Sequence, residues 1–326
     1  MPLPRQNSWR LAAFVTVVCH SWLAAWQPGR TAEPALGAMG EAARWTAAKF
    51  GGVAEIPTKT LPGRPCFTTE PPFSFRYDGQ SSAELRWQPA RASRKLDDQR
   101  SEHTLSYADD KTGLQVRCVA VAYHDFPAVE WTVYFRNAGA SDTPILEDLQ
   151  GLDARFECGA GGEFVLHGIQ GDFCTADSFE PYRRTLAAGT ETKFAPPPSG
   201  KSSDGPKGWP YFNLQFPGGG VILAIGWPGQ WFSSFRRDEG RGLRIRAGQE
   251  LTHLRLKPGE EIRTPLTALL FWQGDDVVAA QNLWRRWYVA HNLPRVGGKP
   301  QPAVAQIQVG GGEKDIAYVQ RFLDAG

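Results

Sequence analysis

Residues 209–231 read WPYFNLQFPGGGVILAIGWPGQW. Two apolar runs, Tyr211–Phe216 and Val221–Gly226, lie on either side of the glycines Gly218–Gly220. Glycine accepts the positive backbone angles of a tight hairpin, so the spacing predicts two antiparallel strands joined by a turn. A phosphate-binding loop would need a helix after the glycines, and a strand-like run follows instead. This stretch therefore indicates an antiparallel β fold.

Similar short runs recur along the chain. Val129–Arg136 alternates large apolar with mostly polar residues, which predicts a strand with one buried face. Turn residues separate further candidates at Phe73–Tyr77, Glu84–Gln88, Leu114–Tyr123, Leu152–Glu157, Glu163–His167, Gly242–Arg246, Leu251–Leu256 and Ile262–Trp272. Ala187–Gly208 has no periodicity and is expected to be a long loop. The pattern predicts a mainly β protein built as a large antiparallel sandwich.

The composition excludes several classes of protein. The 326 residues include 36 Lys and Arg against 34 Asp and Glu, a formal net charge of +2. A nucleic-acid-binding protein would show a clustered basic excess, so no nucleic-acid partner is expected. The chain also holds 12 Trp, 18 Phe and 8 Tyr, enough aromatic volume to fill a core, which argues against disorder.

The N-terminus has the pattern of an export signal. Arg5 and Arg10 precede an interrupted apolar run, Leu11–Trp26, that is shorter than the ~20 residues of a spanning helix. We expect cleavage between Ala24 and Ala35, a secreted or periplasmic protein, and no membrane segment after cleavage. An uncleaved anchor or a start codon assigned too early are the alternatives.

Loss of Cys19 with the signal would leave Cys66, Cys118, Cys158 and Cys174. An even number in an exported protein permits two disulfides, and Cys158 could pair with Cys174 across a short segment. Free buried thiols are the alternative. Because no CxxC or HxxxH spacing occurs, we expect no metal site, and the sequence implies no cofactor.

Helical patterns lie near the two ends. Glu41–Phe50 predicts a short helix within the Ala-, Pro- and Gly-rich stretch 33–65. Asp275 or Asp276 is placed to cap a helix that runs to His291. A strand at Ala303–Val309 and a helix at Glu313–Leu323 would follow. A strand and then a helix at this point suggest the start of an α/β domain rather than more sandwich.

These elements suggest an order of domains. We expect a signal peptide, a lead-in with a short helix, an antiparallel β-sandwich, a helix and the start of an α/β domain, over residues 1–32, 33–65, 66–275, 276–295 and 296–326.

Two loops carry residues suited to sugar binding. Trp227 and Trp231 surround a rigid Pro-Gly turn, and aromatic faces stack on the apolar faces of sugar rings, although core packing is the alternative. His167 and Asp172 lie on a loop with glycines, where an imidazole and a carboxylate could bind sugar hydroxyls, although a plain surface turn is the alternative.

Adjacent acidic residues do not form a catalytic pair. A glycosidase needs two carboxylates about 5–10 Å apart across the scissile bond. Neighbouring residues of a strand point to opposite faces. We therefore expect turn and cap roles for the four acidic pairs, Asp109-Asp110, Asp238-Glu239, Glu260-Glu261 and Asp275-Asp276.

Four segments occur together in order: IGWPGQW (225–231), KPGEEIRTP (257–265), LLFWQGDD (269–276) and QNLWRRWYVAHNLPR (281–295). With them, the chain from Phe73 onward resembles the N-terminal part of family 36 glycoside hydrolases, the melibiase-like α-galactosidases. The resemblance is specific in the second half and weak before about residue 150. It implies a β-supersandwich, a connector helix and then a (β/α)8 barrel.

The resemblance also implies retaining hydrolysis of terminal α-galactosides by two aspartates on later barrel strands. Such a barrel needs ~250 residues, and about 25 are present, so the sequence predicts a non-catalytic, truncated portion with no catalytic residue of its own. An α-galactoside or another carbohydrate, the rest of the barrel and a homo-oligomer are the partners implied.

The resemblance places the His167–Asp172 loop and the loop around Ser202 near the substrate. With the two tryptophans, which the resemblance instead assigns to packing near that edge, the candidate substrate-binding residues are His167, Asp172, Ser202, Trp227 and Trp231. We expect Trp284, Trp287 or Tyr288 of the connector to expose an apolar patch. A free-standing secreted carbohydrate-binding or structural sandwich, or a chain paired with a separate catalytic subunit, are the alternatives.

Overall fold

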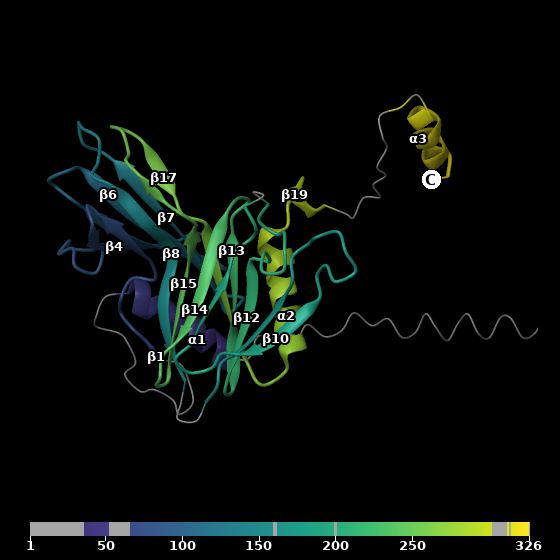
Figure 1. The fold of residues 1–326 in the computed structure, drawn as a ribbon, viewed down its shortest axis with the longest axis horizontal. Coiled ribbons are helices and arrows are strands. Elements are labelled where there is room, and N and C mark those ends of the chain that lie inside the picture. Colours follow the sequence, from purple (N-terminus) through teal and green to yellow (C-terminus); the bar gives the residue numbers. More distant parts are fainter. Residues whose placement is uncertain are drawn as a thin grey trace, which may run out of the picture.

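The computed structural model describes residues 36–51, 66–158, 162–198, 201–301, 312 and 314–325. Two antiparallel sheets dominate it (Figure 1). The prediction of a mainly β, antiparallel sandwich is confirmed. The signal segment and the strand predicted at Ala303–Val309 lie outside the described residues.

The larger sheet has the strand order β10-β9-β12-β13-β18-β7-β6-β5-β4, with β17 beside β7. Its strands are β4 (Ala90–Lys95), β5 (Arg100–Ala108), β6 (Leu114–Tyr123), β7 (Ala128–Asn137), β9 (Val165–Ile169), β10 (Pro181–Thr185), β12 (Tyr211–Phe216), β13 (Gly219–Gly226), β17 (Glu261–Arg263) and β18 (Leu266–Gln273). The hairpin predicted from the opening stretch is β12–β13, in which Phe216 pairs with Gly219 and Gly218 takes a φ of 80°.

The smaller sheet has the order β11-β14-β15-β8-β2-β3, with β1 and β16 beside β8. Its strands are β1 (Cys66–Phe67), β2 (Ser74–Tyr77), β3 (Gln80–Ser81), β8 (Leu146–Glu157), β11 (Glu191–Phe194), β14 (Trp231–Arg237), β15 (Gly242–Gln249) and β16 (His253–Leu254). A two-stranded ribbon of β19 (Arg295–Val296) and β20 (Lys299–Pro300) follows the helical region.

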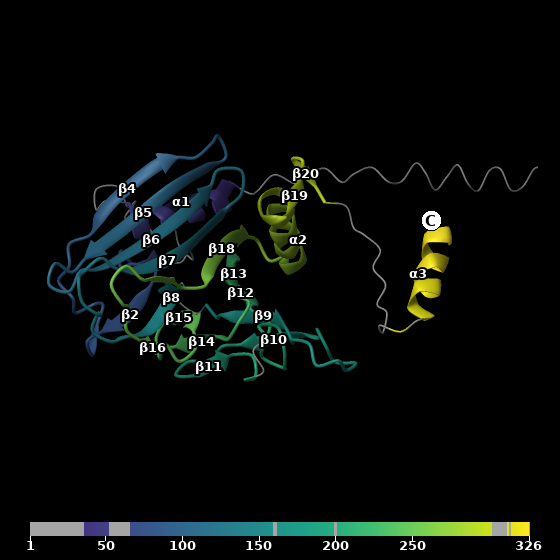
Figure 2. The same cartoon turned by 90° about the horizontal axis from the view of Figure 1, so that it is seen from above.

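The main core lies between the two sheets, which Figure 2 shows as separate layers. Along β15, the buried residues Leu243, Ile245 and Ala247 alternate with the charged residues Arg244 and Arg246. This period of two directs one face of the smaller sheet inward and leaves a charged face outside.

Helix α1 (Leu36–Phe50) contributes to this core. The Trp45 ring stacks on Phe156 of β8 at 5.5 Å between centroids and lies 6.1 Å from both Trp131 of β7 and Phe271 of β18. Its indole therefore contacts both sheets. The predicted short helix is confirmed, and it packs into the sandwich core.

Helix α2 (Val277–Trp287) covers the other face of the larger sheet. It buries Ala280, Leu283 and Trp287 against residues of β13 and β18 such as Ile222 and Leu270. These two strands are therefore covered on both faces, which explains their almost continuous apolar sequence. The predicted cap is confirmed at Asp276, whose carboxylate accepts hydrogen bonds from the N–H groups of Val278 and Ala279.

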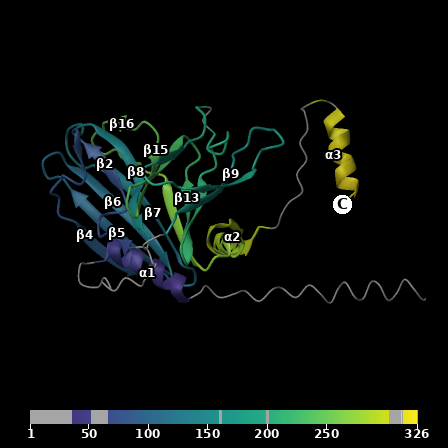
Figure 3. The ribbon, with the colours of Figure 1, turned by 60° about the horizontal axis from the view of Figure 1, so that its bottom comes forward.

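Helix α2 continues directly into a π-helical turn, Tyr288–Asn292. Figure 3 shows α1 and α2 on separate parts of the sandwich. After a gap in the described residues, α3 (Lys314–Ala325) buries none of its side chains. Over the described residues, no helix combines the length and apolar character needed to cross a membrane.

Some predicted strands are wrong. Glu84–Gln88 is a turn and irregular segment, and the chain next forms β4, whose six residues are all exposed. An edge strand of this kind has no buried face to create an alternating pattern.

The predicted strand Ile262–Trp272 is divided into β17 and β18. Thr264 Oγ1 accepts the N–H of Val133 between them, and Pro265 has no N–H to donate to a ladder. The predicted strand Leu251–Leu256 shortens to β16, and a short strand, β11, interrupts the predicted long loop.

Cys118, Cys158 and Cys174 are free thiols. The Cys158 thiol donates to Gly162 O at 3.2 Å, so the structure favours free thiols over a Cys158–Cys174 disulfide. The side chain of Cys66 lies outside the described atoms.

Candidate functional site

A groove of about 1,120 Å³ runs between the hairpin β9–β10 and helix α2. Strands β12 and β13 form its floor through Tyr211, Ala224 and Ile225. The surface of the groove is mainly apolar, and its aromatic residues are Trp209, Tyr211, Tyr182, Trp284 and Tyr288. No Asp or Glu is found among the described residues that line it. Such a surface suits the flat apolar face of a ligand or of another domain.

The helix side of the groove is fixed by polar and aromatic contacts. The Tyr211 hydroxyl donates to Gln281 Oε1, and the ring of Tyr211 meets Trp284 edge to face at 5.3 Å. Burial raises the pKa of Tyr211, so its hydroxyl keeps its proton at neutral pH. The ring centroid of Trp284 in turn lies 4.8 Å from that of the buried Trp287. The aromatic wall is therefore held rigidly by α2.

The expected apolar patch on the connector is confirmed. Tyr288 is 46% exposed and Val289 after it is 49% exposed, and Val278 at the start of α2 is 69% exposed. Trp284 is half-buried, whereas Trp287 is 2% exposed and packs against Tyr123. Large apolar side chains thus continue from the groove onto the outer surface of the helix.

His167 lines the groove on the opposite side. It sits in β9 between Arg183 of β10 and Asn213 of β12, and its Nε2–H donates to Gln215 Oε1 at 2.9 Å. Next to it, a Cβ on Gly168 would come within 2.4 Å of the Tyr182 hydroxyl, so only glycine permits this packing. His167 is half-buried and remains the one residue of the five predicted that lines this groove.

Asp172 holds its own loop together. Its carboxylate accepts hydrogen bonds from Cys174 N at 2.8 Å and from Ser178 Oγ at 2.9 Å. These bonds, the backbone one first, lower the pKa of Asp172. The carboxylate is thus an acceptor that stabilises the turn between β9 and β10.

The structure joins the two loops that the sequence singled out separately. Gly171 N donates to Gly205 O at 2.9 Å, and Asp172 N donates to Ser203 O at 2.8 Å. A Cβ on Gly171 would come within 2.4 Å of Ser203 O, so glycine allows the loops to meet. Ser203 lines the groove directly, one residue after the predicted Ser202.

The two predicted tryptophans differ. Trp231 is fully buried, and its Nε1–H donates to Ser202 O at 2.7 Å. Its indole cannot reach a sugar, so for this residue the packing alternative is correct and the sugar-stacking role is withdrawn. Trp227 is half-buried against the core, with the Arg263 guanidinium 5.2 Å from its ring centroid.

The adjacent acidic pairs act as turn and cap residues, as expected. One carboxylate of each pair accepts a backbone N–H from its own turn or helix: Asp109 from Lys111, Asp238 from Gly240, Glu260 from Lys257 and Asp276 from Val278. In the described part of the chain, no three His, Cys, Asp or Glu side chains are grouped to hold a metal ion.

Sequence reasoning missed Trp209 and Tyr211 as site residues. Both belong to the aromatic-rich stretch 209–231, and this richness in aromatic residues was the one feature of the sequence that could have pointed to them. Trp209 meets the exposed Phe179 edge to face at 5.5 Å, and this contact joins the loop after β9 to the rim of the groove.

Comparisons with known proteins show a likeness in fold. No family model matches the sequence, and no curated protein matches it. The galactosidase domain of an α-galactosidase–sucrose kinase, AgaSK, shares 16% identity at a TM-score of 0.51, over 68% of this chain and 33% of that one.

Two further solved structures are similar. The family GH36 α-galactosidase AgaA from Geobacillus stearothermophilus shares 16% identity at a TM-score of 0.49, over 63% of this chain and 31% of that one. An α-galactosidase from Lactobacillus brevis shares 13% identity at a TM-score of 0.48, over 73% of this chain and 32% of that one. The chain spans about a third of the length of the structures it matches, and what it shares with the AgaSK domain is the fold.

Proposed function

We propose that this chain is the non-catalytic β-sandwich portion of an α-galactosidase-like glycoside hydrolase that acts on terminal α-galactosides. The fold shared with the AgaSK galactosidase domain carries the proposal. The four family-like segments support it, because they fall on connected elements: β13 pairs with β18, β17 and β18 both pair with β7, and α2 packs on β13 and β18.

In this proposal the groove faces the catalytic domain. Its apolar floor and the exposed Tyr288 form a surface that a second domain would bury. The joined loops at His167–Asp172 and Ser203 form one rim of the same groove, where they would approach bound substrate. The chain alone is then expected to be inactive.

Assembly with a catalytic domain tests this directly. The coding sequence beside this chain should specify a (β/α)8 domain with two aspartates, joined to the chain or separate, and co-expression should give an active complex. Trp284→Asp places a charge in the groove and should abolish assembly. Asn282→Asp adds the same charge on an exposed position of the same helix outside the groove and should have no effect. Lack of such a domain, or equal behaviour of the two variants, would refute the proposal.

One observation favours a second function, a free-standing carbohydrate-binding sandwich. The groove offers aromatic side chains without lining carboxylates, which suits sugar binding without hydrolysis. Raffinose, a soluble α-galactoside, is the probe. Under this alternative the isolated chain binds raffinose, and Trp209→Ala removes the binding; under the main proposal, the isolated chain shows no raffinose binding in the groove.

We also propose that the protein is exported, from the charged and apolar pattern of residues 5–26. Expression of the full chain in a bacterium, followed by N-terminal sequencing of the exported protein, tests this. A new N-terminus between Ala24 and Ala35 is expected, and an intact Met1 in the cytoplasmic fraction would contradict it.

A further inference from the structure

The outer face of the smaller sheet carries a row of arginines. Alternation along β15 turns Arg244 and Arg246 away from the core. Strand β14 places Arg236 opposite Arg244, and β8 places Arg155 opposite Arg244 on the other side. Three arginines from adjacent strands therefore lie in one row on one face. Like charges that face each other directly destabilise a sheet, so this row requires negative groups around it.

A hollow of about 310 Å³ lies on this face, over part of the row. Strands β2, β8, β15, β14 and β11, which are neighbours in this order, each contribute to its lining. The described residues that line it include four arginines and three carboxylates, and none of them lines the groove beside α2. Small-ligand pockets begin at about 300 Å³, so the hollow has room for one small ligand.

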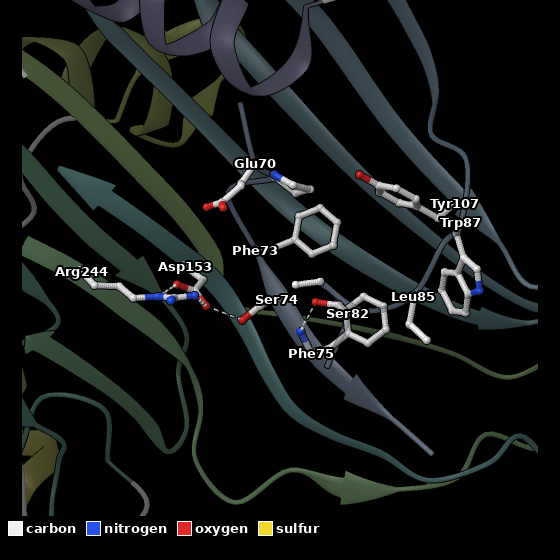
Figure 4. Close-up of a pocket in the computed structure, with 12 residues that line it drawn as sticks. Glu70, Phe73, Ser74, Phe75, Ser82, Leu85, Trp87, Tyr107, Asp153 and Arg244 are labelled. Carbon is white, nitrogen blue, oxygen red and sulfur yellow. Dashed lines mark hydrogen bonds and ion pairs between the residues drawn. The ribbon is translucent and has the colours of Figure 1, made fainter. Parts of the chain in front are cut away.

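Asp153 fixes one side of the hollow before any ligand arrives. Arg244 donates from Nε to Asp153 Oδ1 at 2.6 Å and from Nη2 to Oδ2 at 2.9 Å. Ser74 Oγ donates to the same carboxylate at 2.6 Å. Figure 4 shows Arg244 and Ser74 converging on Asp153, away from the Trp87 ring. The Asp153 side chain is 5% exposed and that of Arg244 is 57% exposed, so a buried carboxylate orients an accessible guanidinium.

Arg246 is held only loosely. Its Nη2 lies 3.6 Å from Asp148 Oδ2, and its Nε lies 3.7 Å from Asp153 Oδ2. Both distances are longer than a hydrogen bond. The Nε atom is buried and has no hydrogen-bond partner within the described residues. Because a buried donor is unfavourable without an acceptor, an additional acceptor at this place would stabilise the Arg246 guanidinium.

Arg236 lies on the same face without a partner. It is exposed, and in the described part of the chain no hydrogen bond or ion pair joins it to another residue. Glu191 of β11 is opposite Arg236, but its carboxylate lies 3.4 Å from Lys193 Nζ. Arg76, at the other end of the hollow, is paired with Glu147 at 3.4 Å. Arg236 is therefore the lining arginine whose charge no direct contact offsets.

The other charges of this face limit the charge of a ligand. The carboxylates on and beside the hollow each contact an arginine or a lysine, and they are Glu147, Asp148, Asp153, Glu157, Glu191 and Asp238. Arg155 contacts two of them, and Glu70 also acts on Arg244 through its charge. The face as a whole therefore has no large positive excess. One unpaired guanidinium attracts a single negative charge rather than a polyanion.

The spacing of the side chains suits a bridging oxyanion. Arg236 pairs with Arg244, so Arg246, two residues further along β15, is its diagonal neighbour. Diagonal neighbours lie about 7–8 Å apart, a separation that long side chains can bridge. Ser234 is opposite Arg246, lines the hollow and is 4% exposed, so it lies at the base. A carboxylate or a sulfate accepts two parallel hydrogen bonds from one guanidinium, and a hydroxyl can donate a third.

We propose that this hollow binds a small ligand through a single oxyanion, a carboxylate or a sulfate group, held between Arg236 and Arg246 above Ser234. Asp153 positions Arg244 beside this oxyanion. The site lies on the sandwich itself and does not rest on the function proposed for the groove, so it is present whether or not a catalytic domain assembles with the chain.

The test is ligand-observed NMR of the full chain with D-galacturonate as the carboxylate probe, methyl sulfate as the sulfate probe and D-galactose as the neutral match of galacturonate. We expect saturable binding of at least one anion, which weakens as the salt concentration rises. Arg236→Gln keeps an amide donor but removes the charge, and should weaken this binding about tenfold. Glu191→Gln removes a carboxylate opposite Arg236, and should tighten it.

Arg91→Gln is the matched control, because Arg91 is also an exposed strand arginine but lies on β4 of the larger sheet, outside the hollow. Its binding of the anions should equal that of the wild type. Thermal melts of every variant establish that it is folded. The proposal is overturned if neither anion binds, if D-galactose binds as tightly as D-galacturonate, or if Arg91→Gln weakens anion binding as much as Arg236→Gln.

Discussion

Helices α1 and α2 cover the same sandwich in different ways. Helix α1 places Trp45 between the sheets and buries Ala42, Ala48 and Phe50 as well. Helix α2 buries Ala280, Leu283 and Trp287, while Val278 near its start and Tyr288 after its end stay exposed, Tyr288 at the groove. Helix α1 therefore completes the core, whereas α2 covers the sheet and leaves apolar side chains open for contact with another molecule or domain.

The largest loss of stability is expected from truncating the main core residue of α1. Trp45→Ala removes an indole that contacts both sheets, and truncation of a buried Trp costs about 3–5 kcal/mol. Urea denaturation followed by circular dichroism measures the loss. A change no larger than that of an exposed α2 substitution would refute the structural role of α1.

The buried Lys49 of α1 should make the stability of the protein depend on pH. Burial lowers the pKa of Lys49 to about 8 from 10.5, while its Nζ donates to the carbonyls of Thr68 and Glu70. Between pH 8 and pH 10.5 the unfolded state binds more protons at this site, so stability rises with pH there.

The rise should be about 3 kcal/mol across that window, since each pKa unit corresponds to about 1.4 kcal/mol. Unfolding free energies of the wild type and of Lys49→Met, measured at several pH values, isolate this contribution from other titrating groups. Parallel curves for the two proteins would show that Lys49 is not desolvated.

A smaller effect is expected at the start of α2. Asp276→Ala removes the carboxylate that accepts the N–H groups of Val278 and Ala279, and loss of such a cap costs about 1 kcal/mol. Asp275→Ala is the matched control, because the neighbouring carboxylate does not cap the helix. Urea denaturation of both variants makes the comparison, and equal losses would contradict the assigned cap.

The smallest effect is expected on the outer side of α2. Val278 is 69% exposed, so Val278→Ala should change the unfolding free energy by no more than about 0.5 kcal/mol. The same variant should reduce binding of a hydrophobic dye if this patch is open in solution. A large loss of stability would mean that α2 is as fully packed as α1.

Local patterns in the sequence were enough to predict the elements with a clear periodicity or a clear cap. Leu114–Tyr123 alternates buried with more accessible residues over most of its length and forms β6 with those same bounds. The Asp276 cap follows from chemistry within three residues. By contrast, β4 presents only exposed residues, and Pro265 interrupts an apolar run that otherwise appears continuous.

The candidate site was harder to predict because it depends on contacts distant in sequence. Asp172 N reaches Ser203 O only after both loops have formed, and local patterns do not encode that contact. Trp227 and Trp231 look equivalent in the sequence, yet Trp231 begins β14 and points into the core. The ion pair of Asp153 with Arg244 likewise joins β8 to β15, which lie far apart along the chain.

The most direct test of the central claim is an assay of the purified chain with a chromogenic α-galactoside. The account predicts no turnover above the uncatalysed rate, because the groove has no described lining carboxylate and no catalytic pair is assigned to this chain. Clear turnover that co-elutes with the chain through successive purification steps would contradict it.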